Sequence, residues 1–420
     1  MSKVLMIAYH YPPVGFSSGV HRTLKFSQYL SEHGWEPLVL TISPHAYERT
    51  SDHQLKDIPQ SIEVVRAFGF DTARHLSIMG RYPGGLALPD RWISWWVSGV
   101  ISGLRLIKKH KPNVIWSTYP IATAHLIALS LHKITGIPWV SDFRDSMTEE
   151  SYPANKTKRR IYRWIERKAV EHSAKSIFTT PGAVRMYAER YPDVESGHWS
   201  LIENGYDEEK FEEIEKVCGT LGVISPKKKV TLVHSGLLYP KERNPIKFFD
   251  AISSLKKQGD FSKEDFQVIL RASGHEDEYA KNLVEYGIDD IVELASPVSY
   301  GDALKEMLEA DGLLLFQGNS CNHQIPAKVY EYIRARRPVF AMTDASGDTA
   351  DVLRDAGINA IVSLDSKDEI LTGLGLFLRA IKEGSAARAS SSAILKHARK
   401  NKAKELAKIL NDINSKKNKE

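Results

Sequence analysis

Ionisable side chains cluster directly after a strand-like segment in the first half of the chain. Asp142, Arg144 and Asp145 follow residues 138–140, whose apolar character predicts a strand. Two carboxylates and a guanidinium in such a loop suit proton transfer or the binding of an acceptor group. An ion pair between neighbouring residues that only shapes the loop explains the pattern equally well. Asp142, Arg144 and Asp145 are therefore candidate catalytic residues, and both interpretations stay open.

A loop near the N-terminus contains two glycines. Gly15 and Gly19 lie between the strand-like residues 4–8 and a helical pattern at 22–31. Glycine allows backbone N–H groups to approach an anion, and a helix N-terminus favours negative charge. The spacing departs from G-x-G-x-x-G, so the sequence disfavours a dinucleotide oxidoreductase. An anion-binding loop and an ordinary loop both remain possible.

A basic loop follows the strand-like residues 230–234 in the second half. Gly236 permits close approach of the backbone to a ligand. Lys241 and Arg243 precede the next helical pattern, where their charges suit a diphosphate. The alternative is a basic loop that contacts only solvent.

Another candidate segment follows the strand-like residues 312–316. Pro326 is typical of the first turn of a helix, and the free N–H groups of that turn could line a ligand site. Glu331 lies further along the same helical pattern and could accept hydrogen bonds from a ribose diol. An ordinary glutamate on a helix surface is the alternative.

Three tryptophans, Trp92, Trp95 and Trp96, fall within five positions of one another. Beside Arg91 and Arg105 they could form a surface that meets a membrane interface. A stripe of this kind more often belongs to a helix core, and we favour the core interpretation.

The elements that position these residues alternate between strand-like and helical patterns, which predicts parallel sheets covered by helices on both faces. The alternation stops near residue 205 and starts again at residue 230. We therefore expect an α/β protein with two doubly wound domains that face a central cleft, the default ligand site. The expected parts are a first domain at 1–205 joined by a C-terminal helix at 393–411, a linker or a helix plus linker at 206–229, a second domain at 230–392, and a basic tail at 414–420.

The composition narrows the class of protein. The 420 residues carry 57 Lys and Arg against 52 Asp and Glu, a net charge of +5. Residues 1–200 contribute +8 and the remainder −3. The basic half suggests a phosphorylated ligand or an anionic membrane surface, and ordinary charge scatter is the alternative. Two cysteines and the absence of a long apolar run favour a cytoplasmic protein without a disulfide scaffold.

Taken together and in order, the motifs resemble retaining glycosyltransferases of family 4, which have the GT-B architecture of two Rossmann-like domains. The resemblance rests on Tyr-Pro-Pro…Gly near the N-terminus, Asp-Phe-Arg-Asp, Glu-Asn-Gly-Tyr-Asp, Ser-Gly…Arg-Asn-Pro and Pro-Ala-Lys-Val-Tyr-Glu-Tyr. It spans essentially the whole chain and is strongest for bacterial enzymes that build surface polysaccharides.

The resemblance implies roles for individual residues. Glu331 would bind the ribose, Arg243 the diphosphate, and the loop around Val298 the base. The remaining implied donor-binding residues are Gly19, Gly236, Lys241, His323, Ile325, Ala327 and Lys328. The sequence departs from the family pattern in three places: His323 replaces the first glutamate of E-x7-E, Leu237 replaces the usual arginine of the donor loop, and Arg144 stands where a histidine is common.

The expected activity is the metal-independent transfer of a sugar, with retention, from a nucleotide-diphosphate sugar to a glycan or lipid-linked acceptor. Asp142 or Asp145 could position or deprotonate the acceptor hydroxyl, and Arg243 could stabilise the leaving group. We expect no cofactor and no metal beyond the donor substrate, and no nucleic-acid partner. The basic first domain could approach the inner face of the plasma membrane. A GT-B subunit that binds nucleotide sugars without catalysis is the alternative function.

Overall fold

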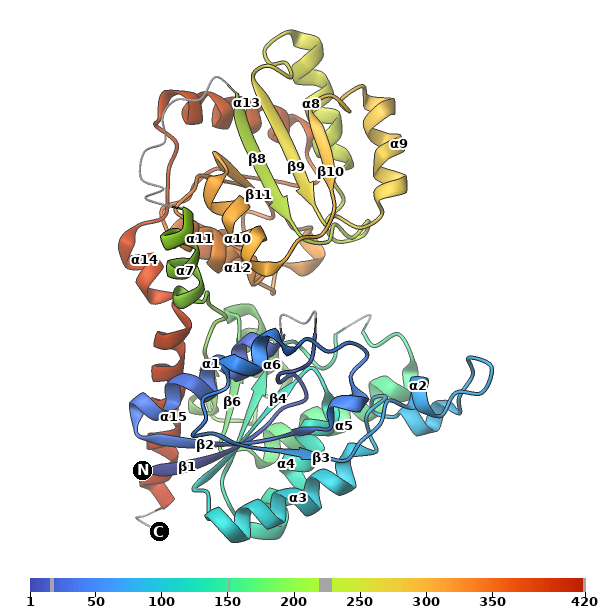
Figure 1. Cartoon of the computed structure of the whole chain (residues 1–420), viewed down its shortest axis with the longest axis vertical. Coiled ribbons are helices and arrows are strands. Elements are labelled where there is room, and N and C mark those ends of the chain that lie inside the picture. The colour runs from blue at the N-terminus through green and yellow to red at the C-terminus, as the bar shows by residue number, and fades with distance from the viewer. Residues whose placement is uncertain (16–18, 150–151, 219–228, 418–420) are drawn as a thin grey trace. The chain divides into compact units, whose positions relative to one another are not determined.

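The structure is a computed structural model that describes residues 1–15, 19–149, 152–218 and 229–417 (Figure 1). The chain forms two compact units, one of Met1–Asn204 with Arg399–Glu420 and the other of Gly205–Ala398. Residues 219–228 of the expected linker, which include most of its Lys-rich run, and residues 418–420 of the expected basic tail lie outside the described part.

A seven-stranded parallel sheet forms the centre of the first unit, in the order β3-β2-β1-β4-β5-β6-β7. The middle strands are buried because helices cover both faces: β1 is buried from Val4 to Ile7, and β4 and β5 are buried along their length although they include polar residues. In register, Leu5 of β1 stands opposite Leu38 and Ile115 of its two neighbours. The strand order reverses beside β1, the place where open sheets bind ligands. The strands are β1 (Ser2–Ile7), β2 (Trp35–Ile42), β3 (Glu63–Ala67), β4 (Val114–Tyr119), β5 (Trp139–Phe143), β6 (Lys175–Phe178) and β7 (Trp199–Leu201).

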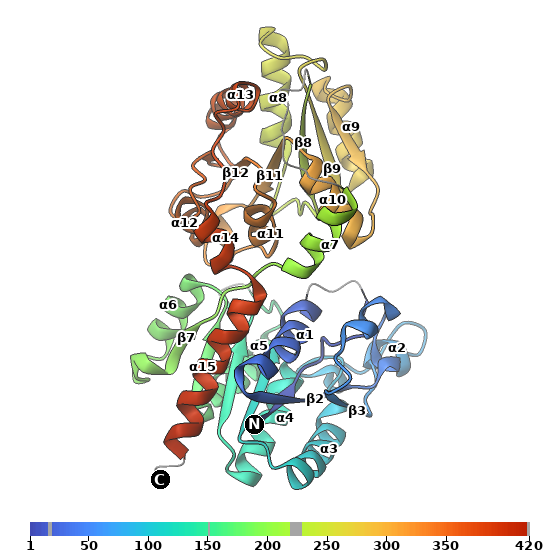
Figure 2. The ribbon, with the colours of Figure 1, turned by 60° about the vertical axis from the view of Figure 1, so that its left-hand side comes forward.

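Right-handed crossovers place the helices of the first unit on both faces of this sheet. Helix α1 packs against α15 on one face, while α3, α4 and α5 pack side by side on the other (Figure 2). Gly99 and Gly103 let α3 approach α4 closely, because a Cβ at either position would lie within 2.6 Å of Ile127 or Leu131. The helices are α1 (Gly19–Tyr29), α2 (Thr72–His75), α3 (Trp95–His110), α4 (Ala122–Thr135), α5 (Lys156–His172), α6 (Pro181–Arg190) and α15 (Arg399–Lys417).

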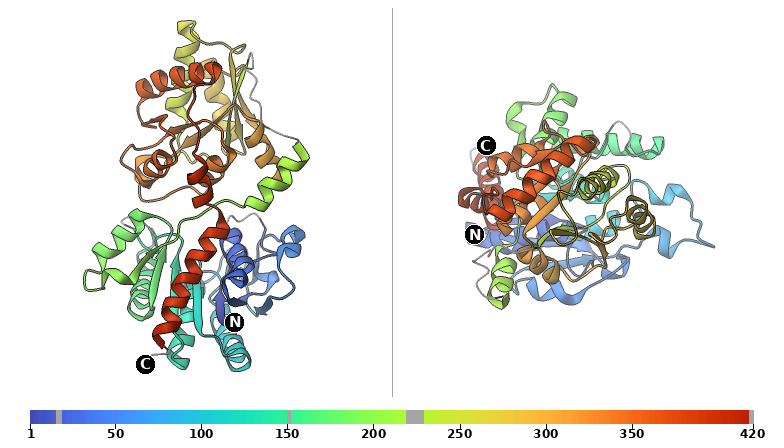
Figure 3. Two further views of the ribbon diagram at one scale, coloured as in Figure 1. Left: turned by 90° about the vertical axis from the view of Figure 1, so that its left-hand side faces the viewer. Right: turned by 90° about the horizontal axis from the view of Figure 1, so that it is seen from above.

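The second unit is built around a six-stranded parallel sheet in the order β10-β9-β8-β11-β12-β13, which reverses beside β8. One apolar core lies under α8, α9 and α13, and another lies under α7, α10, α11, α12 and α14. Helices surround the sheet in both views of Figure 3. The elements are α7 (Glu208–Cys218), β8 (Val230–Ser235), α8 (Ile246–Gln258), β9 (Phe266–Arg271), α9 (Glu276–Tyr286), β10 (Val292–Ala295), α10 (Tyr300–Glu309), β11 (Gly312–Phe316), α11 (Lys328–Ala335), β12 (Val339–Met342), α12 (Asp348–Asp355), β13 (Ile361–Val362), α13 (Lys367–Glu383) and α14 (Ser391–Lys396).

The structure bears on three further expectations from the sequence. The single helix expected at 393–411 is wrong, because α14 ends before His397 and α15 begins at Arg399. The chain breaks there because Tyr206 donates its N–H to the His397 carbonyl and forms a bridge with Ala398. Between the two units the sequence allowed a helix before the linker, and the helix α7, which packs on α10, agrees with that alternative. Of the clustered tryptophans, Trp95 is fully buried in the core whereas Trp96 is 40% exposed.

Candidate functional site

Asp142 lies inside β5 and is fully buried in an ion pair that spans the first unit. Its two oxygens accept hydrogen bonds from Nη2 and Nε of Arg22, at 2.7 and 3.1 Å, and from the Thr118 hydroxyl at 2.8 Å. Arg22 also donates to the Glu203 carbonyl at 3.2 Å. The sequence left open an ion pair between Asp142 and its neighbour Arg144. The structure instead pairs Asp142 with Arg22, which lies 120 residues away in sequence. This arrangement fixes α1 against the ends of β4 and β5.

Arg144 links the loop after β5 to the start of α1. Its Nη1 donates to the Gly19 carbonyl at 3.1 Å, so these two predicted site residues lie together. The Nε of Arg144 is buried and has no hydrogen-bond partner among the described residues. Burial lowers the pKa of Arg144. An anionic or hydroxyl group of a ligand would satisfy the unused N–H.

Asp145 lies next to Arg144, and its side chain reaches solvent. The surrounding protein removes part of its hydration, which raises the pKa of Asp145, while the Arg144 charge opposes that shift. A solvent-accessible carboxylate with a raised pKa is a better proton acceptor than an ordinary aspartate. Of the two aspartates proposed from the sequence, Asp145 is the one whose carboxylate is open to a substrate.

Two histidines that sequence reasoning missed lie at the same edge of the first unit. His10 follows β1 and His21 lies in the first turn of α1. Burial, aided by nearby positive charges, lowers the pKa of each to about 3; the charge is that of Arg144 for His10, and those of Arg399, Lys25 and Arg144 for His21. Both imidazoles are therefore neutral at physiological pH and can donate or accept a hydrogen bond. The position of His10 directly after the first strand was the available sequence signal.

In the second unit, the loops after β8 and β11 are tied together at the reversal of strand order. The Gly318 N–H donates to the Glu242 carbonyl at 2.6 Å, and a Cβ on Gly318 would lie 3.0 Å from that oxygen. The buried Gln317 side chain donates to the carbonyls of Cys321 and Gln324, which holds the second loop in shape. Hydrogen bonds thus hold together the two loops that carry the predicted donor residues.

The Lys328 ammonium group lies against the end of β8. Its Nζ donates to the Ser235 carbonyl at 2.6 Å and lies 3.4 Å from His234 Nε2. Gly236 has φ of +115°, and a Cβ there would lie 2.9 Å from Nζ, so only glycine fits. Burial and the charge of Arg243 lower the pKa of Lys328 to about 7. The amine is thus poised between its charged and neutral forms when no ligand is bound.

The loop after β8 carries two cations, Arg243 and Lys241, which differ in their exposure. Arg243 is half-buried, with its guanidinium 5.6 Å from the centre of the Tyr239 ring and hydrogen-bonded to the Leu237 carbonyl at 3.5 Å. Lys241 is exposed. Arg243 and Lys328 influence each other electrostatically, so the structure brings these two predicted donor residues together.

Glu331 lies in α11 and accepts a hydrogen bond from the Tyr300 hydroxyl at 2.8 Å. Val298 precedes Tyr300 by two residues and is 43% exposed, so the predicted base-binding loop lies beside the predicted ribose-binding carboxylate. His323 and Ala327 are half-buried and Ile325 is buried, in the segment between β11 and α11. Tyr300 was missed because no local spacing relates it to Glu331.

Two further features of the described residues bear on the type of site. Among the described residues, no group of three or more His, Cys, Asp or Glu side chains is arranged to hold a metal ion. None of the helices within the described ranges is long and apolar enough to cross a membrane.

Comparison with known proteins places this geometry in context. Residues 19–205 match a family model described as a glycosyl transferase 4-like domain. Comparison with curated proteins gave no match. HepE from Anabaena in complex with UDP-glucose has a TM-score of 0.64 at 15% identity, over 98% of this chain and 100% of that chain. WaaG, a glycosyltransferase involved in lipopolysaccharide biosynthesis, has a TM-score of 0.58 at 13% identity, over 97% and 99%. UDP-GlcNAc 2-epimerase from Neisseria meningitidis bound to UDP-GlcNAc has a TM-score of 0.53 at 12% identity, over 98% and 100%.

These likenesses, together with the two parallel sheets, confirm the predicted GT-B fold. Because transferases and an epimerase share that fold, it does not by itself name a reaction. The family match adds a likeness to glycosyl transferase 4-like domains over residues 19–205.

Proposed function

We propose that the chain is a retaining, metal-independent glycosyltransferase that moves a sugar from a nucleotide-diphosphate sugar to a growing or lipid-linked glycan. The observation that carries this proposal is a pair of cations in the second unit: the Lys328 ammonium group lies beside Gly236, and the charge of Arg243 acts on it. The family match of the first unit and the UDP-glucose complex of HepE support the substrate class. The proposed setting is the synthesis of a bacterial capsule, exopolysaccharide or O-antigen in the cytoplasm, an idea that the likeness to WaaG supports.

The proposed reaction breaks the bond between the anomeric carbon and a phosphate oxygen, and negative charge develops on the departing diphosphate. Lys328 and Arg243 would stabilise that charge more strongly in the transition state than in the bound donor. The N–H groups of Val329 and Tyr330 in the first turn of α11 donate to the Pro326 and Ala327 carbonyls, so the helix would contribute through its dipole. Side-chain cations in this arrangement take the part that a divalent metal plays in other phosphate-transfer sites.

The remaining donor contacts follow from the second unit. Glu331 would accept hydrogen bonds from the ribose hydroxyls, with Tyr300 holding the carboxylate in place. The exposed loop at Val298 would contact the base. His323, in place of a carboxylate, would donate a hydrogen bond to the donor sugar rather than accept two.

The acceptor chemistry is assigned to the first unit. The acceptor oxygen forms the new bond to the anomeric carbon, and its proton goes to Asp145 or to the leaving phosphate oxygen. Arg144 would orient the acceptor through its unused Nε–H, and its bond to Gly19 sets that orientation. Asp142 acts as a positioning residue, since Arg22 and Thr118 already engage both of its oxygens.

The test is turnover with a panel of UDP- and GDP-sugars, measured as nucleotide release in the presence of glycan acceptors. With the donor that the wild type uses, Arg243→Ala and Glu331→Ala should each lower the rate of nucleotide release at least tenfold. Lys281→Ala, which removes an exposed lysine from α9, is the matched control and should leave the rate unchanged. If the folded protein released nucleotide from none of the donors in the panel, the proposal would be contradicted.

His323 motivates a second candidate, a subunit that binds a nucleotide sugar without transferring it. In that case calorimetry would show donor binding that Glu331→Ala weakens, while nucleotide release stayed at the background rate. The proposed enzyme instead shows binding and release together.

A further inference from the structure

Apolar side chains are exposed on the face of the first unit formed by α3, α4 and α5. On α3, Trp96 is 40% exposed, Val97 is 65% exposed and Ile101 is 47% exposed. On α5, Trp164 is 48% exposed. Fully hydrated tryptophan and aliphatic surface is costly in water, so its concentration on one face requires an explanation.

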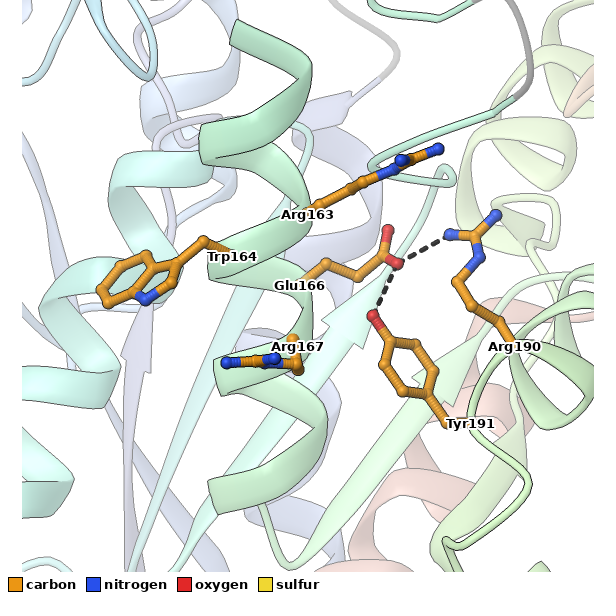
Figure 4. A pocket seen from close by; sticks show the side chains of 6 residues that line it. All are labelled: Arg163, Trp164, Glu166, Arg167, Arg190 and Tyr191. Carbon is orange, nitrogen blue, oxygen red and sulfur yellow. Dashed lines mark hydrogen bonds and ion pairs between the residues drawn. The ribbon is translucent and has the colours of Figure 1, made fainter. Parts of the chain in front are cut away.

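The two exposed tryptophans flank the same central helix. Helix α4 packs between α3 and α5, and its residues from Ala122 to Leu129 are buried. Trp96 reaches across from α3 and donates its Nε1–H to the Ser130 hydroxyl of α4 at 3.0 Å. In Figure 4, Trp164 points away from the side of α5 on which Glu166 and Arg190 meet. The tryptophans therefore belong to one continuous helical layer.

The same layer is strongly basic. Lys and Arg number three in α3, one in α4 and seven in α5, whereas the only acidic residues of these helices are Glu166 and Glu171. Glu166 is fully buried and paired with Arg190 at 2.7 Å. Glu171 is paired with Lys168 at 2.7 Å and with Arg167 at 3.3 Å. The two carboxylates offset two of the eleven positive charges, so these helices keep a net charge of +9 with their histidines neutral.

On α5, Arg160, Arg163 and Arg167 are all exposed and recur at spacings of three and four residues, so they form one stripe with Trp164 at its edge. A hollow of about 430 Å³ lies along this stripe (Figure 4). Its lining residues are Arg163, Trp164, Glu166, Arg167, Arg190 and Tyr191. The hollow is large enough for a phosphate headgroup and presents cations to it.

The combination of groups selects among possible anionic partners. A soluble anionic glycan would satisfy the arginines but would leave Val97 and Ile101 in water. Half-exposed tryptophans beside aliphatic side chains and cations match the headgroup region of a bilayer, where apolar groups enter the interface and cations meet lipid phosphates.

We propose that this face docks on an anionic lipid bilayer, with Trp96 and Trp164 in the headgroup region and Arg160, Arg163 and Arg167 against lipid phosphates. The proposal rests on the proposed function in one respect: docking would bring the first unit to a lipid-linked acceptor. The docking surface consists of Trp96, Val97, Ile101, Arg160, Arg163, Trp164 and Arg167.

The test is co-sedimentation of the full chain with vesicles of phosphatidylcholine alone and of phosphatidylcholine mixed with phosphatidylglycerol. We expect binding to the mixed vesicles that high salt weakens, and little binding to the neutral ones. Replacing Arg160, Arg163 and Arg167 together by Gln should lower the partition coefficient roughly 100-fold, from about fivefold for each charge. Equal binding to both vesicles, or to neither, would overturn the proposal.

Two controls locate the surface. Replacing Lys257, Lys263 and Lys281 of the second unit together by Gln removes the same net charge, and the resulting variant should bind like the wild type. Ile78→Ser combined with Met79→Ser removes the most exposed apolar pair of the first unit outside the surface and should also leave binding unchanged. Loss of binding in either control would refute the assignment of this face.

Two further measurements test how deeply the tryptophans enter the bilayer and whether docking is independent of the reaction. Vesicles with brominated acyl chains should quench tryptophan fluorescence, and Trp96→Phe with Trp164→Phe should abolish most of that quenching. Salt-sensitive sedimentation without quenching would show a polyanion surface and exclude bilayer docking. Nucleotide release from a soluble donor and acceptor should be unchanged in the arginine variant. Release without vesicle binding removes only this inference, and vesicle binding without release removes only the proposed function.

Discussion

Lys328 makes donor binding dependent on pH in a direction that can be calculated. Burial lowers the pKa of its amine to about 7 in the free protein, while the bound diphosphate requires the charged form. At pH 6 about nine-tenths of the molecules carry the ammonium group, and at pH 8 about one-tenth do. Donor affinity should therefore fall about tenfold between pH 6 and pH 8. The rate at saturating donor should change much less, because the bound diphosphate keeps Lys328 protonated.

Lys328→Met keeps the side-chain length and removes the charge. It should lower donor affinity at pH 6 by roughly 10- to 100-fold, from the about 1.5–3 kcal/mol of a hydrogen bond to a charged group, and flatten the pH dependence. Isothermal titration with a nucleotide sugar measures both effects, with Lys281→Met as the matched control. A flat profile in the wild type, or wild-type affinity in Lys328→Met, would refute the reasoning.

The same substitution has a stability consequence of defined sign. Because the folded-state pKa of Lys328 lies below its unfolded value, the unfolded chain binds more protons between about pH 7 and pH 10.5. The wild type should gain stability as pH rises through that range, and Lys328→Met should lack this gain. At pH 7 the variant should be more stable by about 2–4 kcal/mol in denaturant unfolding, after allowance for the lost bond to Ser235.

Other perturbations follow from contacts in each unit. Arg22→Met leaves the Asp142 carboxylate buried without its cation and should cost about 3–5 kcal/mol in urea unfolding; a cost under about 1 kcal/mol would show that the pair is dispensable. Glu331→Gln should weaken nucleotide-sugar binding about tenfold in calorimetry without changing the melting temperature, and equal affinity would exclude a ribose contact. Gly318→Ala forces a methyl group to 3.0 Å from the Glu242 carbonyl and should therefore raise the donor KM several-fold. Vesicle binding, which the first unit provides, should change little.

The sequence predicted the two sheets well because their strands are short apolar runs whose burial on both faces leaves a clear pattern. Helix α5 was not predicted, since eleven of its seventeen residues from Lys156 to His172 are charged or otherwise polar and its apolar stripe is narrow. The break between α14 and α15 was missed because it depends on Tyr206, which is nearly 200 residues away in the chain.

For the site, spacing could place residues at strand ends but could not pair them. Lys328 meets Ser235 across 93 positions, Glu331 meets Tyr300 across 31, and Asp142 meets Arg22 across 120. The sequence therefore named Lys328 and Glu331 as donor residues without their partners. It could not decide between a catalytic and a structural Asp142, because that choice depends on which cation the fold delivers.

Helix α15 contributes Leu406, Ala407 and Leu410 to the core of the first unit, and its Asn411 accepts a hydrogen bond from Trp35 at 2.9 Å. Nearly two hundred residues of the second unit separate this helix from the rest of its own core. During synthesis on the ribosome, the first unit thus emerges early but stays incomplete until residues 399–417 have been made. The surface of α1 that packs on α15 therefore stays exposed during translation until α15 has been made. The second unit, which is continuous in sequence, can finish folding before the first.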